Sequence, residues 1–393
     1  MESAQMVWNH WLTRCCKLLL LLVGLWGPAA AQQVDRVTPD LGAAPPRGVW
    51  IAGPQHNKFW QSRETIRAEL DAYKAAGLNT VYPVVWMQGR SLFPSAVAAS
   101  ITGKRQLSSL GERDALREIL DEAKPLGIRV VAWLEFGFAS HHEGAASTQE
   151  LAHLKPNWVA LNAAGKPVVK NGFHWLNAFD ADVQRFAIDL SVELARNYPD
   201  LHGVQGDDRL PALPSEGGYN SGVRAAYAAE HGGKQPPTDG KDAAWVQWRA
   251  DRLTAFLRQW RSELKAVNPK LVLSSSPSPY PWGLQEYLQD WPRWLREGLI
   301  DEALPQLYRR DVAGYQRLVD ETLALVDPAN RSKVFPGMLL ALGPNVIPSE
   351  TVLAQWIAAT RAAGFGGEVY FHSTGVERRA DVLRKAYGVT DKP

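Results

Sequence analysis

Three short stretches decide the fold: AAGLNTVYPV (75–84), KPLGIRVVAW (124–133) and AAGFGGEVYF (362–371). In each stretch an amphipathic run ends at or just before a glycine, and a short apolar run follows. Glycine favours the left-handed conformation in which many helices end, and a short apolar run without alternation is typical of a strand buried on both faces. Each stretch therefore predicts the same unit, which is a helix, a glycine turn and a parallel strand.

The same alternation continues from residue 47 to the end of the chain. Strands are predicted at residues 48–53, 80–86, 129–136, 203–208, 270–276, 302–308, 333–340 and 367–373. Helices are predicted at residues 62–76, 111–125, 181–197, 243–267, 286–298, 312–325, 349–363 and 377–386. Strands that alternate with helices form a parallel sheet, and eight such units predict a single (β/α)8 TIM barrel, an α/β fold.

A doubly wound open sheet is the rival fold. It calls for a glycine-rich phosphate loop after the first strand, and GVWIAGPQHNKF (48–59) contains no G-x-G-x-x-G pattern. Three long polar segments, 88–110, 137–180 and 209–242, each follow a predicted strand. In a barrel such loops lie on the C-terminal face, where barrel enzymes carry their active sites.

Residues 1–31 have the pattern of a secretory signal peptide. Arg14 and Lys17 precede the apolar run 18–26, and alanines at 29–31 provide a cleavage site. The run is shorter than the ~20 residues that span a bilayer, although a membrane anchor is the alternative. Residues 32–46 are predicted as a linker and 47–393 as the barrel. We expect an exported bacterial protein, periplasmic or secreted, with no stable membrane insertion after cleavage.

The composition narrows the functional class. Lys and Arg total 43 against 41 Asp and Glu, a formal net charge of +2, which excludes electrostatically driven binding of nucleic acid. Hydrophobic residues make up 46% and charged residues 21%, as in ordinary globular proteins. The chain has 16 Trp, whose flat rings suit sugar binding but also fill cores.

Acidic residues stand at the ends of two neighbouring predicted strands. Glu135 ends the third strand beside Trp133 and Phe136, so burial should raise its pKa, as a general acid requires near neutral pH. Asp207 and Asp208 end the fourth strand, and alternation turns one of them toward the barrel mouth. Carboxyl groups from adjacent strands suit glycoside hydrolysis, in which one protonates the leaving oxygen while the other attacks or activates water.

Structural roles are the alternative for these acids. Glu135 could pair with a buried arginine such as Arg129 or Arg309. One aspartate of the pair could cap a loop or the next helix.

Further strand-end residues suit sugar binding, although an aromatic residue in a barrel strand is more often core. The ring candidates are Trp86, Trp133, Tyr308 and Tyr370, and the hydrogen-bonding candidates are Asn177, Gln306, Arg309 and His372. His141, His142 and Glu143 lack the spacing of a metal site, so no metal or other cofactor is predicted. The absence of G-x-S-x-G removes the usual esterase interpretation.

Several motifs together resemble glycoside hydrolase-like family 10. They include RGVWIAG (47–53), LNTVYPVVWMQGRSLFPS (78–95), GIRVVAWLEFGF (127–138), WLNAFDADVQRF (175–186), GVQGDD (203–208) and QLYRRD (306–311). The resemblance implies an exported TIM-barrel glycosidase, in a family that includes a division-associated enzyme cleaving peptidoglycan glycan strands without stem peptides. It also implies a sugar cleft, which would contain Glu135, Asp207, Asp208, Trp86, Asn177, Tyr308 and Arg309.

Two positions depart from the pattern of that family. Gly206 stands where a Phe is typical, and Arg209 stands where a His is typical. The missing ring at Gly206 implies a wider site or altered sugar contacts.

The sequence therefore predicts a cofactor-independent glycoside hydrolase that acts on a cell-envelope polysaccharide, with peptidoglycan glycan strands as the expected substrate. Asp208 is expected nearest the anomeric carbon, Glu135 as proton donor, and Asp207 as a group that orients or replaces Asp208. The other readings are a non-catalytic glycan-binding protein on the same barrel and an envelope scaffold with a vestigial cleft.

Overall fold

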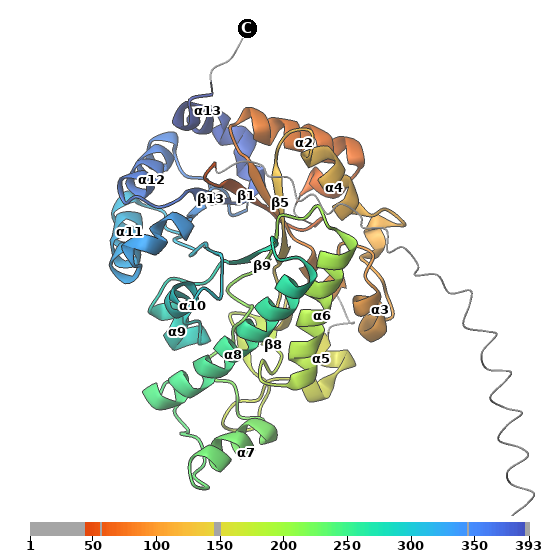
Figure 1. Cartoon of the computed structure of the whole chain (residues 1–393), viewed down its shortest axis with the longest axis vertical. Coiled ribbons are helices and arrows are strands. Elements are labelled where there is room, and N and C mark those ends of the chain that lie inside the picture. Colours follow the sequence, from red (N-terminus) through yellow and green to blue (C-terminus); the bar gives the residue numbers. More distant parts are fainter. Residues whose placement is uncertain (1–43, 56, 145–150, 344–345, 390–393) are drawn as a thin grey trace, which may run out of the picture. The chain divides into compact units, whose positions relative to one another are not determined.

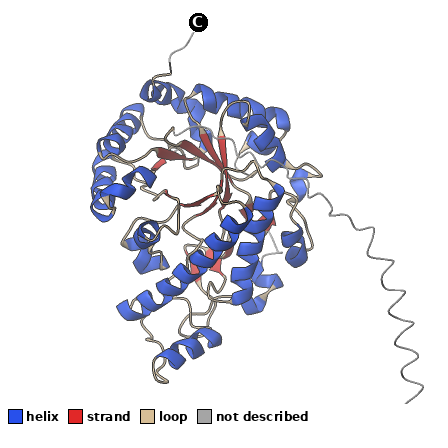
Figure 2. Ribbon diagram, in the orientation of Figure 1, coloured by secondary structure: helices blue, strands red, loops and turns tan. Residues whose placement is uncertain are grey.

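The computed structural model describes residues 44–55, 57–144, 151–343 and 346–389. The predicted signal peptide and most of the linker lie outside these residues. Eight parallel strands form the central sheet, and Figure 2 shows them in red with helices in blue around them. They are β1 (Arg47–Ile51), β2 (Thr80–Pro83), β5 (Arg129–Leu134), β9 (Gly203–Gly206), β10 (Val272–Ser275), β11 (Glu302–Ala303), β12 (Gly337–Leu339) and β13 (Glu368–Phe371).

The sheet closes on itself. Its strands follow the order β11-β10-β9-β5-β2-β1-β13-β12. The two ends of this order, β11 and β12, meet through isolated parallel bridges from Ala303 to Val334 and from Gln306 to Gly337. The (β/α)8 prediction is therefore confirmed, and the open doubly wound sheet is excluded.

Helices connect consecutive strands and cover the outside of the sheet (Figure 1). Those between barrel strands and after the last strand are α2 (Arg63–Ala75), α4 (Ala115–Ala123), α6 (Ala181–Asn197), α8 (Ala243–Val267), α10 (Trp291–Arg296), α11 (Val312–Leu325), α12 (Glu350–Ala362) and α13 (Val376–Tyr387). Among the described helices, none is both long and apolar enough to cross a membrane.

The long loops carry structure of their own. The first contains β3 (Trp86–Met87), β4 (Arg90–Ser91) and α3 (Ala96–Thr102). The second contains β6 (Ala139–His142), α5 (Leu151–Leu154), β7 (Val169–Lys170) and β8 (Phe173–Trp175), in which β6, β8 and β7 form a small antiparallel sheet. The later loops contain α7 (Ser221–Glu230) and α9 (Trp282–Tyr287), and short 3-10 turns occur at Lys58–Trp60, Ser108–Leu110, Pro156–Trp158, Pro328–Lys333 and Ser373–Gly375.

Local sequence signals set most element ends. The three glycines of the repeated unit, Gly77, Gly127 and Gly364, have positive φ of 87°, 63° and 74°, as the glycine turns predict. The predicted helix 286–298 is wrong as a single element. Leu288 has a φ of 62°, a left-handed conformation that ends α9 before α10 begins.

Side chains fill the interior of the barrel. Trp50 of β1 lies 5.7 Å from Tyr82 of β2, measured between ring centroids. Its indole Nε1 donates to Gln205 Oε1 at 2.7 Å, and Gln205 Nε2 donates to Ser274 Oγ at 2.9 Å. This layer is fully buried and forms the floor beneath the strand ends that carry the acids.

Candidate active site

Glu135 and the aspartate pair follow two strands that are neighbours in the sheet. β5 pairs with β9 in a register that places Trp133 opposite Gln205 and Leu134 opposite Gly206. Gln205 points into the barrel, because it bonds to Trp50. Alternation therefore directs Asp207, two residues further on, toward the same interior.

Asp207 is completely buried and held by protein donors. Its Oδ2 accepts from Trp133 Nε1 at 3.3 Å and from Arg209 Nη2 at 2.7 Å, and its Oδ1 accepts from the Arg209 amide at 2.9 Å. Burial raises the pKa of Asp207, while Arg209 opposes this shift. With no exposed surface, Asp207 is suited to orient its neighbours rather than to touch a sugar.

Asp208 is the more accessible member of the pair. Its side chain is 27% exposed, and its Oδ1 lies 3.0 Å from Arg209 Nη1. The negative charge of Asp208 acts on the phenols of Tyr287 and Tyr308. Burial is the largest cause and Asp208 the next that raise the pKa of Tyr287 to about 12, and the same two causes raise the pKa of Tyr308 well above its usual value. The partner of the Asp208 carboxylate is therefore the Arg209 guanidinium, and its charge acts on both phenols.

Glu135 lies at the barrel mouth and is half-buried. Burial raises the pKa of Glu135 to about 7; Arg209 opposes this rise and Asp208 adds to it. The side chain lines a cleft of about 480 Å³ whose other walls include Phe371, His372 and Thr374. A carboxyl group with this pKa beside a cleft has the properties of a general acid.

The structural pairings considered for Glu135 are not formed. Arg129 donates to Thr80 Oγ1 at 3.0 Å and Asn79 Oδ1 at 3.2 Å, at the opposite end of β5. Arg309 donates to the backbone oxygen of Tyr308 at 2.7 Å. The cation that acts on Glu135 is Arg209.

Arg209 is the functional residue that sequence reasoning missed. Besides its contacts to both aspartates, its Nε donates to the backbone oxygen of Glu135 at 2.7 Å. The guanidinium carbon lies 4.8 Å from the ring centroid of Phe173 and 5.6 Å from that of Phe136. One side chain therefore joins the ends of β5 and β9. Its position directly after two acids was the available signal, but the sequence alone showed it only as a departure.

Gly206 corrects a second expectation. A Cβ at this position would overlap the carbonyl oxygen of Leu210, because the chain turns tightly after β9. Gly206 is also buried. The missing ring therefore does not widen a sugar site; it allows the turn that places Asp207 and Asp208.

Several predicted sugar-binding residues gather around Phe371. Its ring centroid lies 5.3 Å from Tyr308, 5.1 Å from His372 and 6.5 Å from Trp133. His372 and Phe371 line the same cleft as Glu135. Trp133 is only 3% exposed, so it supports Asp207 rather than offering a face to a sugar.

Other candidates lie elsewhere. Trp86 is 1% exposed and packs 5.3 Å from Phe186 of α6, so the expectation that it stacks on a sugar is corrected. Tyr370 is fully buried, and its hydroxyl lies 2.6 Å from that of Tyr387 in α13, which places it on the outer side of the sheet. Register along the strands, which decides these orientations, could not be read from the sequence.

Asn177, Gln306 and Arg309 bond to nearby parts of the protein. Buried Asn177 accepts from the Phe179 amide at 3.3 Å in the turn before α6. Gln306 donates to the backbone oxygen of Ser276 at 3.0 Å. Half-buried Arg309 bonds to its own strand end, as described above. A sugar-binding role for these three stays a prediction.

The two histidines, His141 and His142, lie on β6 of the small antiparallel sheet, whose strand β8 carries the Phe173 ring that contacts Arg209. The His141 ring stacks on His174 with centroids 4.2 Å apart, and the His142 ring contacts Phe173 at 4.8 Å. Within the described residues, no group of three or more His, Cys, Asp or Glu side chains is placed to hold a metal ion.

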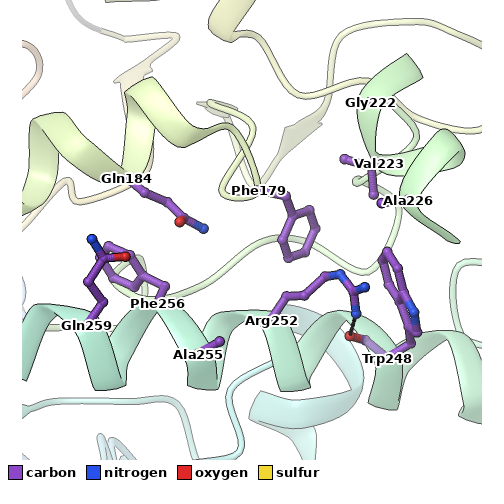
Figure 3. A pocket seen from close by; sticks show the side chains of 10 residues that line it. All are labelled: Phe179, Gln184, Gly222, Val223, Ala226, Trp248, Arg252, Ala255, Phe256 and Gln259. Carbon is purple, nitrogen blue, oxygen red and sulfur yellow. Dashed lines mark hydrogen bonds between the residues drawn. The ribbon is translucent and has the colours of Figure 1, made fainter. Parts of the chain in front are cut away.

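A second groove lies between α6, α7 and α8 (Figure 3). Its volume is about 300 Å³, and Phe179 points into it from the turn before α6. One face of Trp248 is covered by Arg252, whose guanidinium carbon lies 3.1 Å from the ring centroid. None of the three acids lines this groove.

Residues 45–338 match the family described as Glycosyl hydrolase-like 10. The chain belongs to this family. The glycosyl hydrolase DigH of Escherichia coli K12 is a relative that is 25% identical to this chain over 354 residues, and the match covers 77% of each protein.

Solved structures share the barrel of this Glycosyl hydrolase-like 10 protein. The PgaB (BpsB) glycoside hydrolase domain of Bordetella bronchiseptica superposes with a TM-score of 0.63 at 15% identity, covering 88% of this chain and 100% of that one. The catalytic domain of the Paenibacillus polymyxa β-amylase gives 0.61 at 12% identity, with 88% and 98% covered. At these identities the likeness establishes the fold alone.

Proposed function

We propose that this protein is an exported glycoside hydrolase that cleaves a cell-envelope polysaccharide, with peptidoglycan glycan strands as substrate. The observation that carries the proposal is the placement of Glu135. It is half-buried in a cleft at the barrel mouth, its pKa is raised to about 7, and Asp208 lies in the same electrostatic neighbourhood. Membership in the Glycosyl hydrolase-like 10 family supports the reaction class.

The roles follow from exposure and partners. Glu135 donates a proton to the leaving glycosidic oxygen, because near neutral pH a large fraction of this carboxyl group is protonated. Asp208, which is 27% exposed and paired with Arg209, acts at the anomeric carbon, as a nucleophile or by activating water. Buried Asp207 fixes the orientation of Arg209 and so of both partners.

The substrate and location are supported by the sequence. The signal-peptide pattern in residues 1–31 supports export, and the resemblance of the motifs to a family with a peptidoglycan-cleaving member supports the glycan strand. DigH, a relative over 77% of the chain, is named as a glycosyl hydrolase.

The test compares carboxyl substitutions on peptidoglycan from which the stem peptides have been removed. Glu135→Gln and Asp208→Asn should each lower the release of reducing ends by about 10²–10⁴-fold. Glu302→Gln is the matched control. Burial raises the pKa of Glu302 to about 7 as well, but it lies near Arg129 at the other end of the barrel. Unchanged turnover in both site variants would remove the assignment.

A glycan-binding protein without catalysis is the second candidate. The observation that favours it is the ion pair of Asp208 with Arg209, which neutralises the carboxylate that would react. This function predicts retention of the glycan without product, and site substitutions that change affinity but not rate. Measurable release of reducing ends by the wild-type protein excludes it.

A further inference from the structure

Trp282 differs from every other described tryptophan. Its exposed fraction is 47%, whereas the others are buried at 8% or less. A large apolar ring that faces solvent loses the free energy of burial, which is about 1.5–3 kcal/mol for a large side chain. Single exposed apolar residues are common, so exposure alone does not define a site. The surroundings of Trp282 supply the further observations.

The fold places Trp282 on the face that carries the acids. It begins α9, in the loop that follows β10, and in a parallel barrel every loop after a strand lies at the C-terminal face. The ring is backed by Tyr287, with centroids 5.3 Å apart. Tyr287 is itself buried and packs 5.7 Å from Trp175. The exposed ring is therefore fixed against a rigid support.

The same support leads to the candidate active site. The Tyr287 hydroxyl accepts from Asn171 Nδ2 at 2.8 Å, and the pKa of Tyr287 responds to Asp208. Tyr287 thus contacts Trp282 directly and is the residue through which this ring is connected to the electrostatic surroundings of Asp208. Asn171, which shares Tyr287 as a contact with Trp282, is an exposed residue.

The charges beside the supporting ring of Tyr287, whose centroid lies 5.0 Å from Lys170 Nζ, are already paired. Lys170 lies 3.0 Å from Glu216 and 2.6 Å from Glu286, and Lys241 also pairs with Glu286. An aromatic ring with an amide nearby and neutralised charges suits the apolar face and hydroxyl groups of an uncharged pyranose, as every second sugar of a peptide-free peptidoglycan strand is. The groove of Figure 3 is less suited, because Arg252 covers a face of its tryptophan.

We propose that Trp282 is the stacking platform of an outer sugar subsite, where it binds a pyranose ring of the substrate beyond the sugar at the cleaved bond, with Asn171 bonding to its hydroxyl groups. This inference rests on the proposed function, since the ligand is the glycan strand itself. It predicts that Trp282 contributes to the binding of long oligosaccharides and not to the binding of short ones.

The kinetic test uses peptide-free peptidoglycan oligosaccharides of increasing length. Trp282→Ala should raise KM for the longest oligosaccharides by about three- to tenfold, the range of one aromatic stacking contact. The kcat on the shortest cleaved oligosaccharide should not change. Trp282→Phe, which keeps a ring, should recover part of the affinity. Leu325→Ala is the control, because Leu325 is 36% exposed at the end of α11, on the opposite face.

A binding measurement separates this inference from the proposed function. In the Glu135→Gln protein, long oligosaccharides should protect tryptophan fluorescence from iodide, and Glu135→Gln with Trp282→Phe should lose that protection. Equal KM values for Trp282→Ala and wild type at every length, or no protection by any oligosaccharide, overturn the platform. If the wild-type protein cleaves nothing but protection is observed, the platform stands and the hydrolase proposal fails.

Discussion

Arg209 concentrates the chemistry of the candidate site in one side chain. Each of its three side-chain nitrogens has a different partner, namely Asp207, Asp208 and the backbone oxygen of Glu135, and its guanidinium lies over the ring of Phe173. A lysine cannot reproduce these contacts, because an ammonium group has no planar fork. The relative placement of Asp208 and the end of β5 at Glu135 therefore depends on this one side chain.

Arg209→Gln should separate a positioning role from a purely structural one. Arg209 lowers the pKa of Glu135, so its removal should raise that pKa from its value of about 7. A general acid must be protonated, so the alkaline limb of kcat/KM should move to higher pH while the maximum rate falls. The measurement is the pH profile of both proteins between pH 5 and 9, with Arg209→Lys beside them. A fallen rate with an unmoved limb would contradict the assignment.

Glu135→Gln should stabilise the protein at alkaline pH. The pKa of Glu135 is raised from 4.5 to about 7 in the folded state. Between these values the folded state holds a proton that the unfolded chain releases, so stability falls as pH rises through this window. A glutamine avoids the loss, and at pH 8 the variant should gain about 1–3 kcal/mol in free energy of unfolding.

Denaturant unfolding at pH 4.5 and pH 8 checks this prediction. The gain should appear at pH 8 only, since at pH 4.5 most of this effect is absent. A gain of equal size at both values would show that a packing change, and not ionisation, is responsible.

At the scale of elements, the end of β9 positions the acids through its tight turn. Gly206 is needed because the chain folds back so that Leu210 lies against it, and Gln289 donates to the backbone oxygen of Asp207 at 2.9 Å. Gln289 lies between α9 and α10, in the segment where a continuous helix was predicted. The break at Leu288 is what allows Gln289 to reach the turn after β9.

Gly206→Ala tests this turn. The added methyl group would displace the carbonyl of Leu210, so we expect a loss of about 1–3 kcal/mol in stability. Activity should fall with it, since Asp207 and Asp208 follow directly. Gly222→Ala is the matched control, because a Cβ there meets nothing within 4 Å and α7 should gain up to about 1 kcal/mol. Equal effects of the two substitutions on thermal unfolding would contradict the account.

At the scale of the whole molecule, sequence pattern predicted the barrel and the strands that carry the acids. The repeated helix, glycine and strand unit sufficed, because burial on both faces leaves an unalternating apolar run. Orientation was harder to predict. In the sequence, Trp86 and Tyr370 were aromatic strand residues that suited sugar binding, but in the structure both pack against helices. Trp282 could not be found at all, since exposure in a loop depends on contacts between distant segments.

Two acids of the barrel, Glu135 and Glu302, have raised pKa values. The pKa of Glu302 is raised to about 7 by burial, against the attraction of Arg129. Arg129 is the first residue of β5, whereas Glu135 follows its last residue, and neither acid is among the causes of the other's pKa shift. We therefore expect the two sites to contribute independently. At pH 8 the double variant of Glu135→Gln and Glu302→Gln should therefore gain the sum of the single gains, as measured by denaturant unfolding. A clearly smaller sum would indicate coupling through the core.

The short contact between β11 and β12 has a consequence for local opening of the barrel. Two isolated bridges join these strands, whereas β5 and β9 pair at four consecutive positions in the middle of the strand order. A barrel that opened between β11 and β12 would therefore expose its interior while Glu135 and Asp207 stayed on paired strands, so closure would not have to reassemble them.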